Sequence, residues 1–169
     1  MLTTDQHRLL DAAQIKAKVQ RLAFQIYEYN YAEPALTLIG VAGNGVLLAR
    51  MLADELRRIS PFDPSVGTVK LNKTAPLDAP IVFDVSPDVI ARHSVVIVDD
   101  VLNTGRTLAY ALRPFLDLPL HRLQVVVLVD RDHKSFPIAA DFVGHTLATT
   151  LQEHVEVRLD DEEHGVYLR

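Results

Sequence analysis

The chain has 169 residues, and its 17 basic against 22 acidic side chains give a formal charge of −5, with no cysteine. This excludes disulfides, thiolate catalysis and cysteine metal sites, and the seven histidines lack the i, i+4 spacing of a zinc helix. No apolar stretch reaches the roughly 18 residues of a membrane span, and residues 1–8 lack the apolar core of a signal peptide. We therefore expect one soluble cytoplasmic domain over residues 1–169, with no membrane partner.

The first half of the chain alternates helical and strand patterns. Spaced apolar residues predict helices, and short apolar runs predict strands: helices over residues 6–29 and 46–59, and strands over residues 35–39, 66–71 and 81–85. Asp5 is available as the N-cap of the first helix, and Gly40 ends the first strand. The polar stretch 72–80 carries two prolines, which predicts a hairpin with a long mobile loop.

The second half continues the alternation. Its predicted elements are a strand over residues 95–98, a helix over 108–113, a strand over 124–129 and a closing hairpin over 155–159 and 166–168. Pro114 should kink or end the helix, and Pro119 closes that segment. The pattern predicts an α/β fold in which helices cover both faces of a central parallel sheet and ligands bind outside the carboxyl ends of the strands.

A polar run joins the strand at 95–98 to the following helix. Asp99 and Asp100 come directly after the apolar residues, and the segment from Asn103 to Thr107 reads Asn-Thr-Gly-Arg-Thr. Backbone N–H groups and hydroxyls in such a turn can close around a phosphate at a helix N-terminus, and the acids then face ribose hydroxyls or a magnesium ion. The alternative is a solvated structural turn.

A second glycine-containing turn runs from Gly40 to Gly45, between a strand and a helix. Its glycine spacing matches a Walker A loop, but Val46 and Leu47 stand where Lys and Ser/Thr are required. The dinucleotide fingerprint fails as well, since Leu48 stands where Gly or Ala is needed. The turn is either a phosphate loop of another kind or a tight strand-to-helix connection.

The run from Val95 to Thr107 resembles the phosphoribosyl pyrophosphate (PRPP) signature of the type I phosphoribosyltransferases. Nearly the whole chain is similar to the PyrR family, in which a uracil phosphoribosyltransferase fold also regulates pyrimidine genes by binding messenger RNA. The similar segments are Leu10–Asp11 with the following helix, Gly40–Glu55, Asp99–Thr107, Val129–His133 and Pro137–Gly144. The resemblance implies a type I fold with a flexible loop and a small C-terminal hood. It also implies an enzyme that transfers phosphoribose from PRPP to uracil and releases pyrophosphate and UMP in pyrimidine salvage.

The resemblance also assigns roles at the PRPP site. Asp99 and Asp100 would stabilise positive charge on the ribose, position its hydroxyls and offer a ligand to the Mg²⁺ that accompanies PRPP. Successive strand side chains leave on opposite faces, so both acids can reach the sugar only if the strand has ended at Asp99. The 5-phosphate would be held by Asn103, Thr104, Gly105, Arg106 and Thr107, with a solvent-facing side chain as the alternative for Arg106.

Two further segments would close around the leaving group. Ala42, Gly43 and Asn44 occupy the place of the pyrophosphate loop, where relatives usually carry Lys-Thr-Arg or Arg-Thr-Arg, so both customary cations are missing. Backbone donors would then hold the pyrophosphate. Lys73 stands in the mobile segment where relatives have an arginine, and we expect it to close over the site and exclude water.

The expected base site includes Asp130 and Val143. Hypoxanthine-guanine relatives carry a lysine at position 130 that donates to the purine carbonyl, whereas an ionised Asp130 can only accept, which favours a pyrimidine. Val143 would supply main-chain hydrogen bonds and apolar contact from the hood. The alternative for Asp130 is a surface ion pair with Arg131. Neither His93 nor His133 is assigned as a general base.

Further functions stay open. The chain keeps Arg21, His133 and Lys134 on the family's RNA face, but Phe24 and Tyr29 replace expected cations, so RNA binding is disfavoured. A purine (hypoxanthine or xanthine) phosphoribosyltransferase and a degenerate nucleotide-binding domain without turnover are two more candidate functions. Family tendency points to a homo-oligomer, a dimer or larger.

Overall fold

A computed structural model describes residues 7–150, 152–160 and 162–169. The helices are α1 (Ala12–Asn30), α2 (Asn44–Ile59), α3 (Pro87–Ile90) and α4 (Arg106–Leu116). The strands are β1 (His7–Asp11), β2 (Leu36–Val41), β3 (Ser65–Lys70), β4 (Val82–Phe83), β5 (Ser94–Leu102), β6 (Arg122–Asp130), β7 (Phe142–Thr146), β8 (Val155–Arg158) and β9 (Gly165–Leu168). In the described part of the chain, no helix is both long and apolar enough to cross a bilayer.

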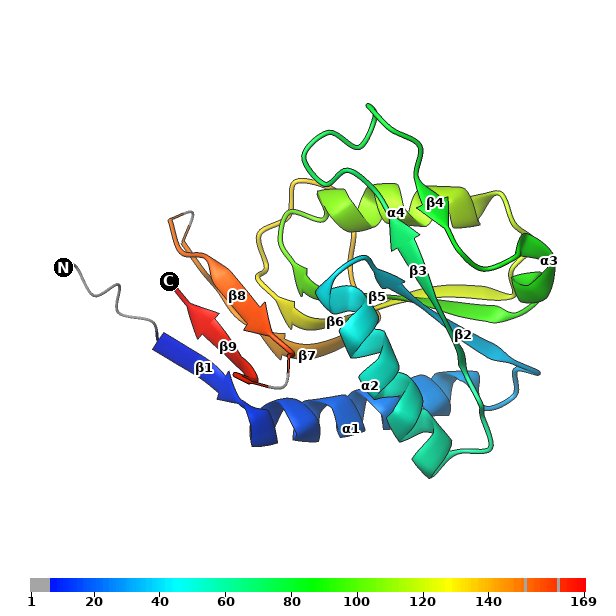
Figure 1. The fold of residues 1–169 in the computed structure, drawn as a ribbon, viewed down its shortest axis with the longest axis horizontal. Coiled ribbons are helices and arrows are strands. Elements are labelled where there is room, and N and C mark those ends of the chain that lie inside the picture. The colour runs from blue at the N-terminus through cyan, green and yellow to red at the C-terminus, as the bar shows by residue number, and fades with distance from the viewer. Residues whose placement is uncertain (1–6, 151, 161) are drawn as a thin grey trace.

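Six strands form the central sheet in the order β4-β3-β2-β5-β6-β7, and only β4 runs antiparallel to its neighbour. A smaller antiparallel sheet, β1-β9-β8, lies beside its carboxyl edge and is called the hood below (Figure 1). The loop from β3 to β4 projects from the top of the molecule in Figure 1. The predicted α/β sheet, the hairpin with its long tip and the C-terminal hairpin are confirmed.

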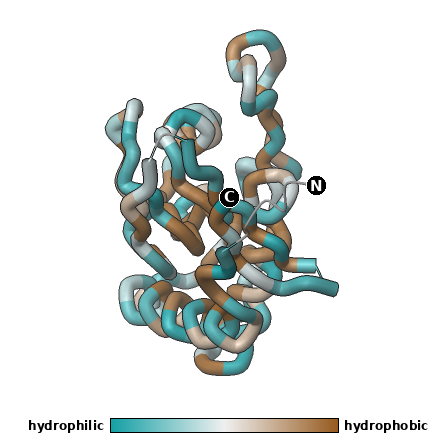
Figure 2. Tube along the Cα trace, turned by 90° about the vertical axis from the view of Figure 1, so that its left-hand side faces the viewer, coloured by the Kyte–Doolittle hydropathy of each residue, from teal (hydrophilic) through white to brown (hydrophobic). Residues whose placement is uncertain are grey.

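The central strands are buried on both faces because helices cover each side. Val96 and Val98 of β5 pack into a core with α1, α2 and the hood, whereas Val95 and Ile97 pack into a second core with α4. Figure 2 shows brown and teal residues alternating around the helices, as expected where one face of each is buried. This alternation along β5 is regular from Val95 to Val98.

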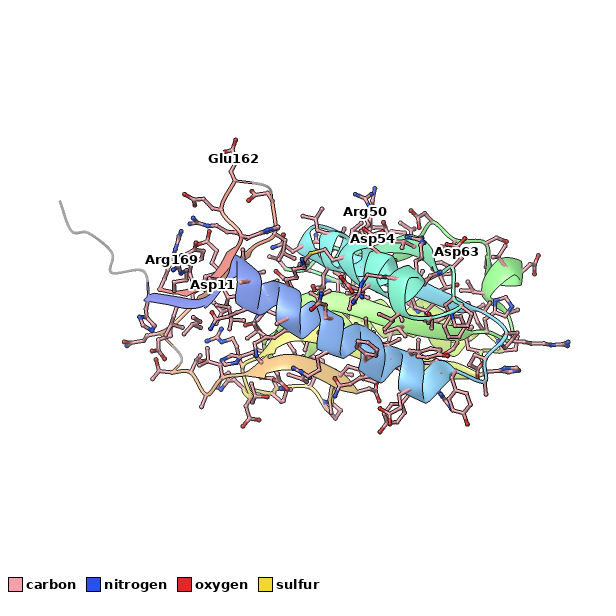
Figure 3. All side chains as sticks on the ribbon, turned by 90° about the horizontal axis from the view of Figure 1, so that it is seen from below. Asp11, Arg50, Asp54, Asp63, Glu162 and Arg169 are labelled. Carbon is pink, nitrogen blue, oxygen red and sulfur yellow. The ribbon has the colours of Figure 1, made fainter. Side chains whose placement is uncertain are left out.

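The predicted helix over residues 6–29 is wrong at its start. Residues 7–11 form β1, which pairs with β9, and the helix begins only at Ala12. Asp11 is the N-cap: its side chain accepts from the Gln14 N–H at 2.8 Å, and the Gln14 side chain accepts from the Asp11 N–H at 2.9 Å. Figure 3 labels Asp11 at this junction, near Arg169 of the hood. The predicted cap, Asp5, lies outside the described residues.

Three elements differ from expectation in the second half. Helix α4 continues through Pro114 to Leu116. Pro114 lies in the last turn, where the bend that its ring causes displaces only the end of the helix, so it is tolerated better there than in a helix interior. The single turn α3 and strand β7 are not predicted by the sequence pattern; β7 pairs parallel with β6 and forms the edge of the central sheet.

Candidate active site

The site lies where the carboxyl ends of β2, β5 and β6 meet. The register pairs Gly40 with Val98 and Leu102 with Asp130, so the turns that follow these three strands are neighbours. The predicted phosphate turns and Asp130 therefore share one edge of the sheet. This is the place where ligands bind in open α/β sheets.

The turn before α4 forms a small, open pocket lined by Asp99 and residues 101–108. Gly105 has a φ of 86°, and a Cβ there would lie 3.2 Å from Cβ of Ile138, so the turn needs glycine. The backbone N–H groups of Gly105, Thr107 and Leu108 have no acceptor among the described residues. The pocket thus offers several donors to an anion at the N-terminus of α4. The Arg106 side chain is exposed.

β5 continues through both acids to Leu102, but its side-chain alternation breaks there: Val101 packs in the same core as Val98, and Leu102 packs in the core with α4. Asp99 lines the phosphate pocket and is 4% exposed. Asp100 is half-buried on the side of α2 and the hood. The strand does not end at Asp99, as that condition requires, but the break in alternation means that the two acids need not leave on opposite faces.

The buried carboxyl of Asp99 has an unusual acidity. Burial and the neighbouring charge of Asp100 raise the pKa of Asp99 to about 8, while the charge of Lys73 acts in the opposite direction. Oδ1 of Asp99 accepts from the Asp100 N–H at 3.0 Å, and Oδ2 accepts from no N–H group of the described residues. Oδ2 of Asp99 can therefore bind a cation or accept a hydrogen bond from a hydroxyl group in this pocket.

Asn44 connects the second turn to Asp100. Its Nδ2 donates to Oδ2 of Asp100 at 3.0 Å and to the carbonyl of Val157 in the hood at 2.8 Å, which uses both amide hydrogens. Neither Ala42 nor Gly43 has a side-chain donor, so the turn can offer only backbone groups to an anion. The N–H groups of Gly43, Asn44 and Gly45 have no acceptor among the described residues.

The turn at Gly45 also needs glycine. A Cβ at this position would lie 2.6 Å from the carbonyl oxygen of Val98, far inside contact distance. The start of α2 therefore lies directly against β5. This close approach brings the unpaired N–H groups of the turn beside the acidic end of that strand.

Asp130 and Arg131 do not form the surface ion pair that was the alternative interpretation. Asp130 instead pairs with Lys134. Arg131 contacts two segments at once: Asn103 Oδ1 at 2.9 Å in the phosphate turn, and the hood connection through Thr149 Oγ1 at 2.9 Å and the Glu153 carbonyl at 2.7 Å. Arg131 therefore fastens the chain before β8 to the phosphate turn.

Lys73 and Val143 are not among the residues that line the phosphate pocket. Lys73 is exposed in the loop between β3 and β4, where Oδ1 of Asn72 accepts from the N–H groups of Thr74 and Ala75, each at 3.1 Å, and folds the turn around it. The prediction that Val143 belongs to the hood is wrong, because Val143 lies in β7 at the edge of the central sheet, and its carbonyl accepts from Arg21 of α1 at 3.1 Å. The predicted roles, closure over the leaving group for Lys73 and contact with the base for Val143, therefore stay predictions.

Sequence reasoning misses the bridges made by Asn44 and Arg131 and the pairing of Lys134. In the sequence, Asn44 is notable only because relatives carry a cation at that position. Arg131 is considered only as an ion-pair partner of Asp130, and Lys134 only as a cation of the RNA-binding surface. The Asp-x-x-x-Lys spacing from Asp130 to Lys134 is the one available signal for the pair.

Comparisons with known proteins agree with this geometry. Residues 5–162 match the phosphoribosyl transferase domain family. The chain is 34% identical to the bifunctional protein PyrR of Ligilactobacillus salivarius over 96% of this chain and 97% of that protein. It is 36% identical to the bifunctional protein PyrR of Streptomyces coelicolor over 92% of this chain and 84% of that one.

Solved structures show the same fold. The hypoxanthine phosphoribosyltransferase of Trypanosoma cruzi superposes with a TM-score of 0.77 at 21% identity, covering 95% of this chain and 94% of that one. A hypoxanthine-guanine phosphoribosyltransferase from Bacillus anthracis gives 0.70 at 21% identity, covering 85% and 84%. The predicted type I fold is confirmed.

Proposed function

The chain belongs to the phosphoribosyl transferase domain family and is an enzyme of that glycosyltransferase class, and we propose that it transfers phosphoribose from PRPP to uracil, releasing pyrophosphate and UMP. The observation that carries the proposal is the pocket in which buried Asp99 faces the unpaired N–H groups before α4. A 5-phosphate fits the donors, and a ribose beside it reaches Asp99. Asp130, one strand away, is then within reach of a base.

The chemistry follows from the charges. When a ring nitrogen of the base attacks the anomeric carbon and pyrophosphate departs, positive charge accumulates on the ribose. A carboxylate at Asp99 stabilises that charge and orients a ribose hydroxyl, while the turn from Asn103 to Thr107 holds the 5-phosphate. Asp100, whose side chain accepts a hydrogen bond from Asn44, would contribute a second negative charge beside the ribose.

Mg²⁺ fits this donor set as an ion held chiefly by substrate. The described residues contain no group of three or more His, Asp or Glu placed to hold a metal, but Oδ2 of Asp99 accepts from none of their N–H groups. Asp99 or Asp100 would supply one or two carboxylate ligands, the number Mg²⁺ commonly takes from protein beside phosphates. Bound there, Mg²⁺ would neutralise charge on the leaving pyrophosphate.

The pyrophosphate would be held by the turn at Ala42, Gly43 and Asn44. The N–H groups of Gly43, Asn44 and Gly45, which have no acceptor among the described residues, lie at the N-terminus of the 16-residue helix α2. A helix N-terminus favours a bound anion. Lys73 is the cation that the loop between β3 and β4 can bring over the leaving group, since its charge already acts on Asp99. Val143 would contact the base from β7.

The proposal does not include regulation by RNA. Two of the three cations retained from that surface are engaged within the chain: Arg21 donates to the carbonyls of Val143 and Gly144, and Lys134 pairs with Asp130. Phe24 is 54% exposed and Tyr29 is 62% exposed where cations would contact phosphates. A protein of charge −5 with this surface should bind RNA weakly at physiological salt.

The test is pyrophosphate release from PRPP and Mg²⁺ with uracil, hypoxanthine, guanine or orotate. We expect turnover with uracil, abolished in Asp99→Ala and kept in Arg50→Ala, an exposed position on α2. Turnover with a purine alone would overturn the assignment of the base. Silence with every base, while calorimetry shows PRPP binding, would favour the nucleotide-binding domain without turnover.

A further inference from the structure

One face of α1 is left uncovered by the rest of the described chain. In Figure 3 the helix lies in front of the sheet, and no other helix or strand passes over it. Exposed side chains recur along this face at alternating intervals of three and four residues, and we call them the α1 row: Gln14, Ala17, Arg21, Phe24, Glu28 and Tyr31. Tyr31 directly follows α1 and keeps helical backbone angles. Such intervals bring side chains to one side of a helix and are typical of helices that pair.

The first half of the α1 row forms one wall of an open groove. The groove is lined by apolar and basic side chains from β1, α1 and β7: Leu9, Leu10, Gln14, Ala17, Lys18, Arg21 and His145. Arg21 already donates within the chain, to the carbonyls of Val143 and Gly144 at 3.1 and 2.7 Å. A guanidinium that spends its N–H groups in this way can still stack its flat face on an aromatic ring. The groove therefore suits an aromatic side chain from outside.

The second half of the α1 row carries the opposite features. Phe24 is 54% exposed and Tyr31 is 72% exposed, so two aromatic side chains project beyond the groove. The charge is opposite as well, because this half has Glu28 and the first half has Lys18 and Arg21. A surface with a basic groove at one end and aromatic rings beside an acid at the other is complementary to itself across a two-fold axis.

We propose that α1 packs antiparallel against α1 of a second copy of this chain. Arg21 then faces Phe24 of the second copy. Ala17 likewise faces the Glu28 of that copy, and Gln14 faces its Tyr31. Each contact occurs twice, because an interface with two-fold symmetry uses the same surface of both copies. This inference concerns assembly and does not depend on the proposed function.

The antiparallel orientation follows from size and charge. A parallel pair would place Arg21 against Arg21 and Glu28 against Glu28, and the two Phe24 rings would meet each other while both grooves stayed empty. In the antiparallel pair each Phe24 ring enters the other copy's groove beside Arg21, and each Glu28 lies within one helical turn of a cation. Buried aromatic rings and arginines are the side chains that contribute most to protein interfaces.

The pairing would also cover the surface that relatives use for RNA. Phe24 stands there in place of an expected cation, which disfavours phosphate contacts. In the proposed dimer the same ring lies near the centre of the interface. The substitution that counts against RNA binding thus favours contact with a second copy.

Sedimentation equilibrium of the full chain tests the association. A single helix pair forms a small interface, so we expect a reversible dimer with a dissociation constant on the order of micromolar. Phe24→Ser should weaken the dimer at least about 10-fold, because it removes the central ring. The matched control is Leu116→Ser, at an apolar side chain that is 69% exposed at the end of α4, and it should leave the mass unchanged. Circular dichroism verifies that both variants are folded.

Disulfide cross-linking tests the orientation, since the chain has no cysteine of its own. A mixture of Ala17→Cys and Glu28→Cys should cross-link rapidly under mild oxidation. Ala17→Cys by itself should not, because the two copies of position 17 then lie about 16 Å apart along the helix axis, beyond the roughly 7 Å that a disulfide spans between Cα atoms. Arg50→Cys mixed with Glu28→Cys gives the background of random collision, since Arg50 lies on α2.

Each result supports or overturns the proposal. A protein that stays monomeric at every concentration overturns it, and so does a dimer that Phe24→Ser leaves as tight as Leu116→Ser does. Cross-linking of Ala17→Cys with itself, as fast as with Glu28→Cys, would show a different orientation and also counts against it. Altered RNA binding in Phe24→Ser with no change in mass would assign the α1 row to RNA instead.

Discussion

Asn44 donates from Nδ2 to Oδ2 of Asp100 at 3.0 Å and so joins the turn after β2 to the acidic end of β5. The second hydrogen of the same amide goes to Val157 in the hood. One half-buried side chain therefore holds together the loop that would receive the pyrophosphate, one of the two acids and the hood. The consequence is that a change at Asn44 should affect both stability and the ligand site.

Asn44→Ala should lower the free energy of unfolding by about 1–3 kcal/mol, because a half-buried carboxylate and a carbonyl each lose a donor. It should also raise the KM for PRPP, since Asp100 is no longer held. Urea unfolding and steady-state kinetics measure the two effects. The exposed Asn72→Ala, which removes only a turn in the β3–β4 loop, is the control for stability. An Asn44→Ala variant as stable as the parent would contradict the bridge.

Ala42→Lys should strengthen PRPP binding, because the turn now offers only neutral backbone donors to pyrophosphate. A charge-assisted hydrogen bond contributes roughly 1.5–3 kcal/mol, which corresponds to about 10- to 100-fold in affinity. Calorimetry with PRPP and Mg²⁺ measures the gain, and binding of UMP, which has no pyrophosphate, should not change. An equal gain for UMP would mean that the new charge acts nonspecifically.

The free energy of unfolding should fall as pH rises from about 4 to about 8. Burial raises the pKa of Asp99 to about 8 in the folded protein, from an ordinary value of 3.8. In that window the folded state holds a proton that the unfolded state has released, so raising the pH favours unfolding, by at most about 1.4 kcal/mol per pH unit. Urea midpoints between pH 5 and pH 8 measure the slope.

Asp99→Asn should flatten this dependence, since an amide does not titrate. The exposed Asp78→Asn should keep the slope of the parent and serves as its control. Mg²⁺ with PRPP should also reduce the slope, because a cation at the carboxylate favours its ionised form. A slope unchanged by Asp99→Asn would assign the pH dependence to other groups.

Lys73→Ala should lower turnover without changing folding, because an exposed loop cation contributes little to stability. Release of free pyrophosphate without base, which reports hydrolysis of PRPP, should rise relative to transfer if Lys73 helps exclude water. Lys70→Ala, at the exposed end of β3, is the control. Unaltered kinetics in Lys73→Ala would remove Lys73 from the closing loop.

The sequence predicts most of the central sheet, because strands buried on both faces read as unbroken apolar runs such as Val95–Val98. The phosphate turn follows from local chemistry in the same way. Strand β1 could not be predicted from local periodicity, since its partner β9 lies more than 150 residues later and only that pairing makes residues 7–11 extended. Helix α4 differs in another way: the local signal of Pro114 predicts a kink or an end, but the helix continues to Leu116 because Pro114 lies in its last turn.

The site is harder to predict than the sheet because side-chain partners come from distant segments. The pairing of Asn44 with Val157 spans 113 residues, and that of Arg131 with Asn103 spans 28. Sequence identifies the residue types, but it does not show that the side-chain alternation of β5 breaks between Val98 and Val101. The strand continues through this break, paired with β6 as far as Leu102.

Arg131→Gln should loosen the hood and the phosphate turn together. Arg131 donates to Asn103, Thr149 and the carbonyl of Glu153, and a glutamine amide cannot span these three partners. The loss of charge-assisted bonds should cost about 2–4 kcal/mol of the free energy of unfolding. Arg131→Lys should recover only part of it, because a single ammonium replaces a planar fork.

The more specific readout is amide hydrogen exchange. In Arg131→Gln we expect exchange to accelerate in residues 147–150 and 152–155 and in the turn at 103–107, while α2 and the strand cores keep their protection. Arg50→Gln, on the outer face of α2, should leave both segments unchanged (Figure 3). If exchange in the two segments accelerates equally in both variants, or in neither, then Arg131 does not couple them and the hood is held by the Asn44 contact and its apolar core alone.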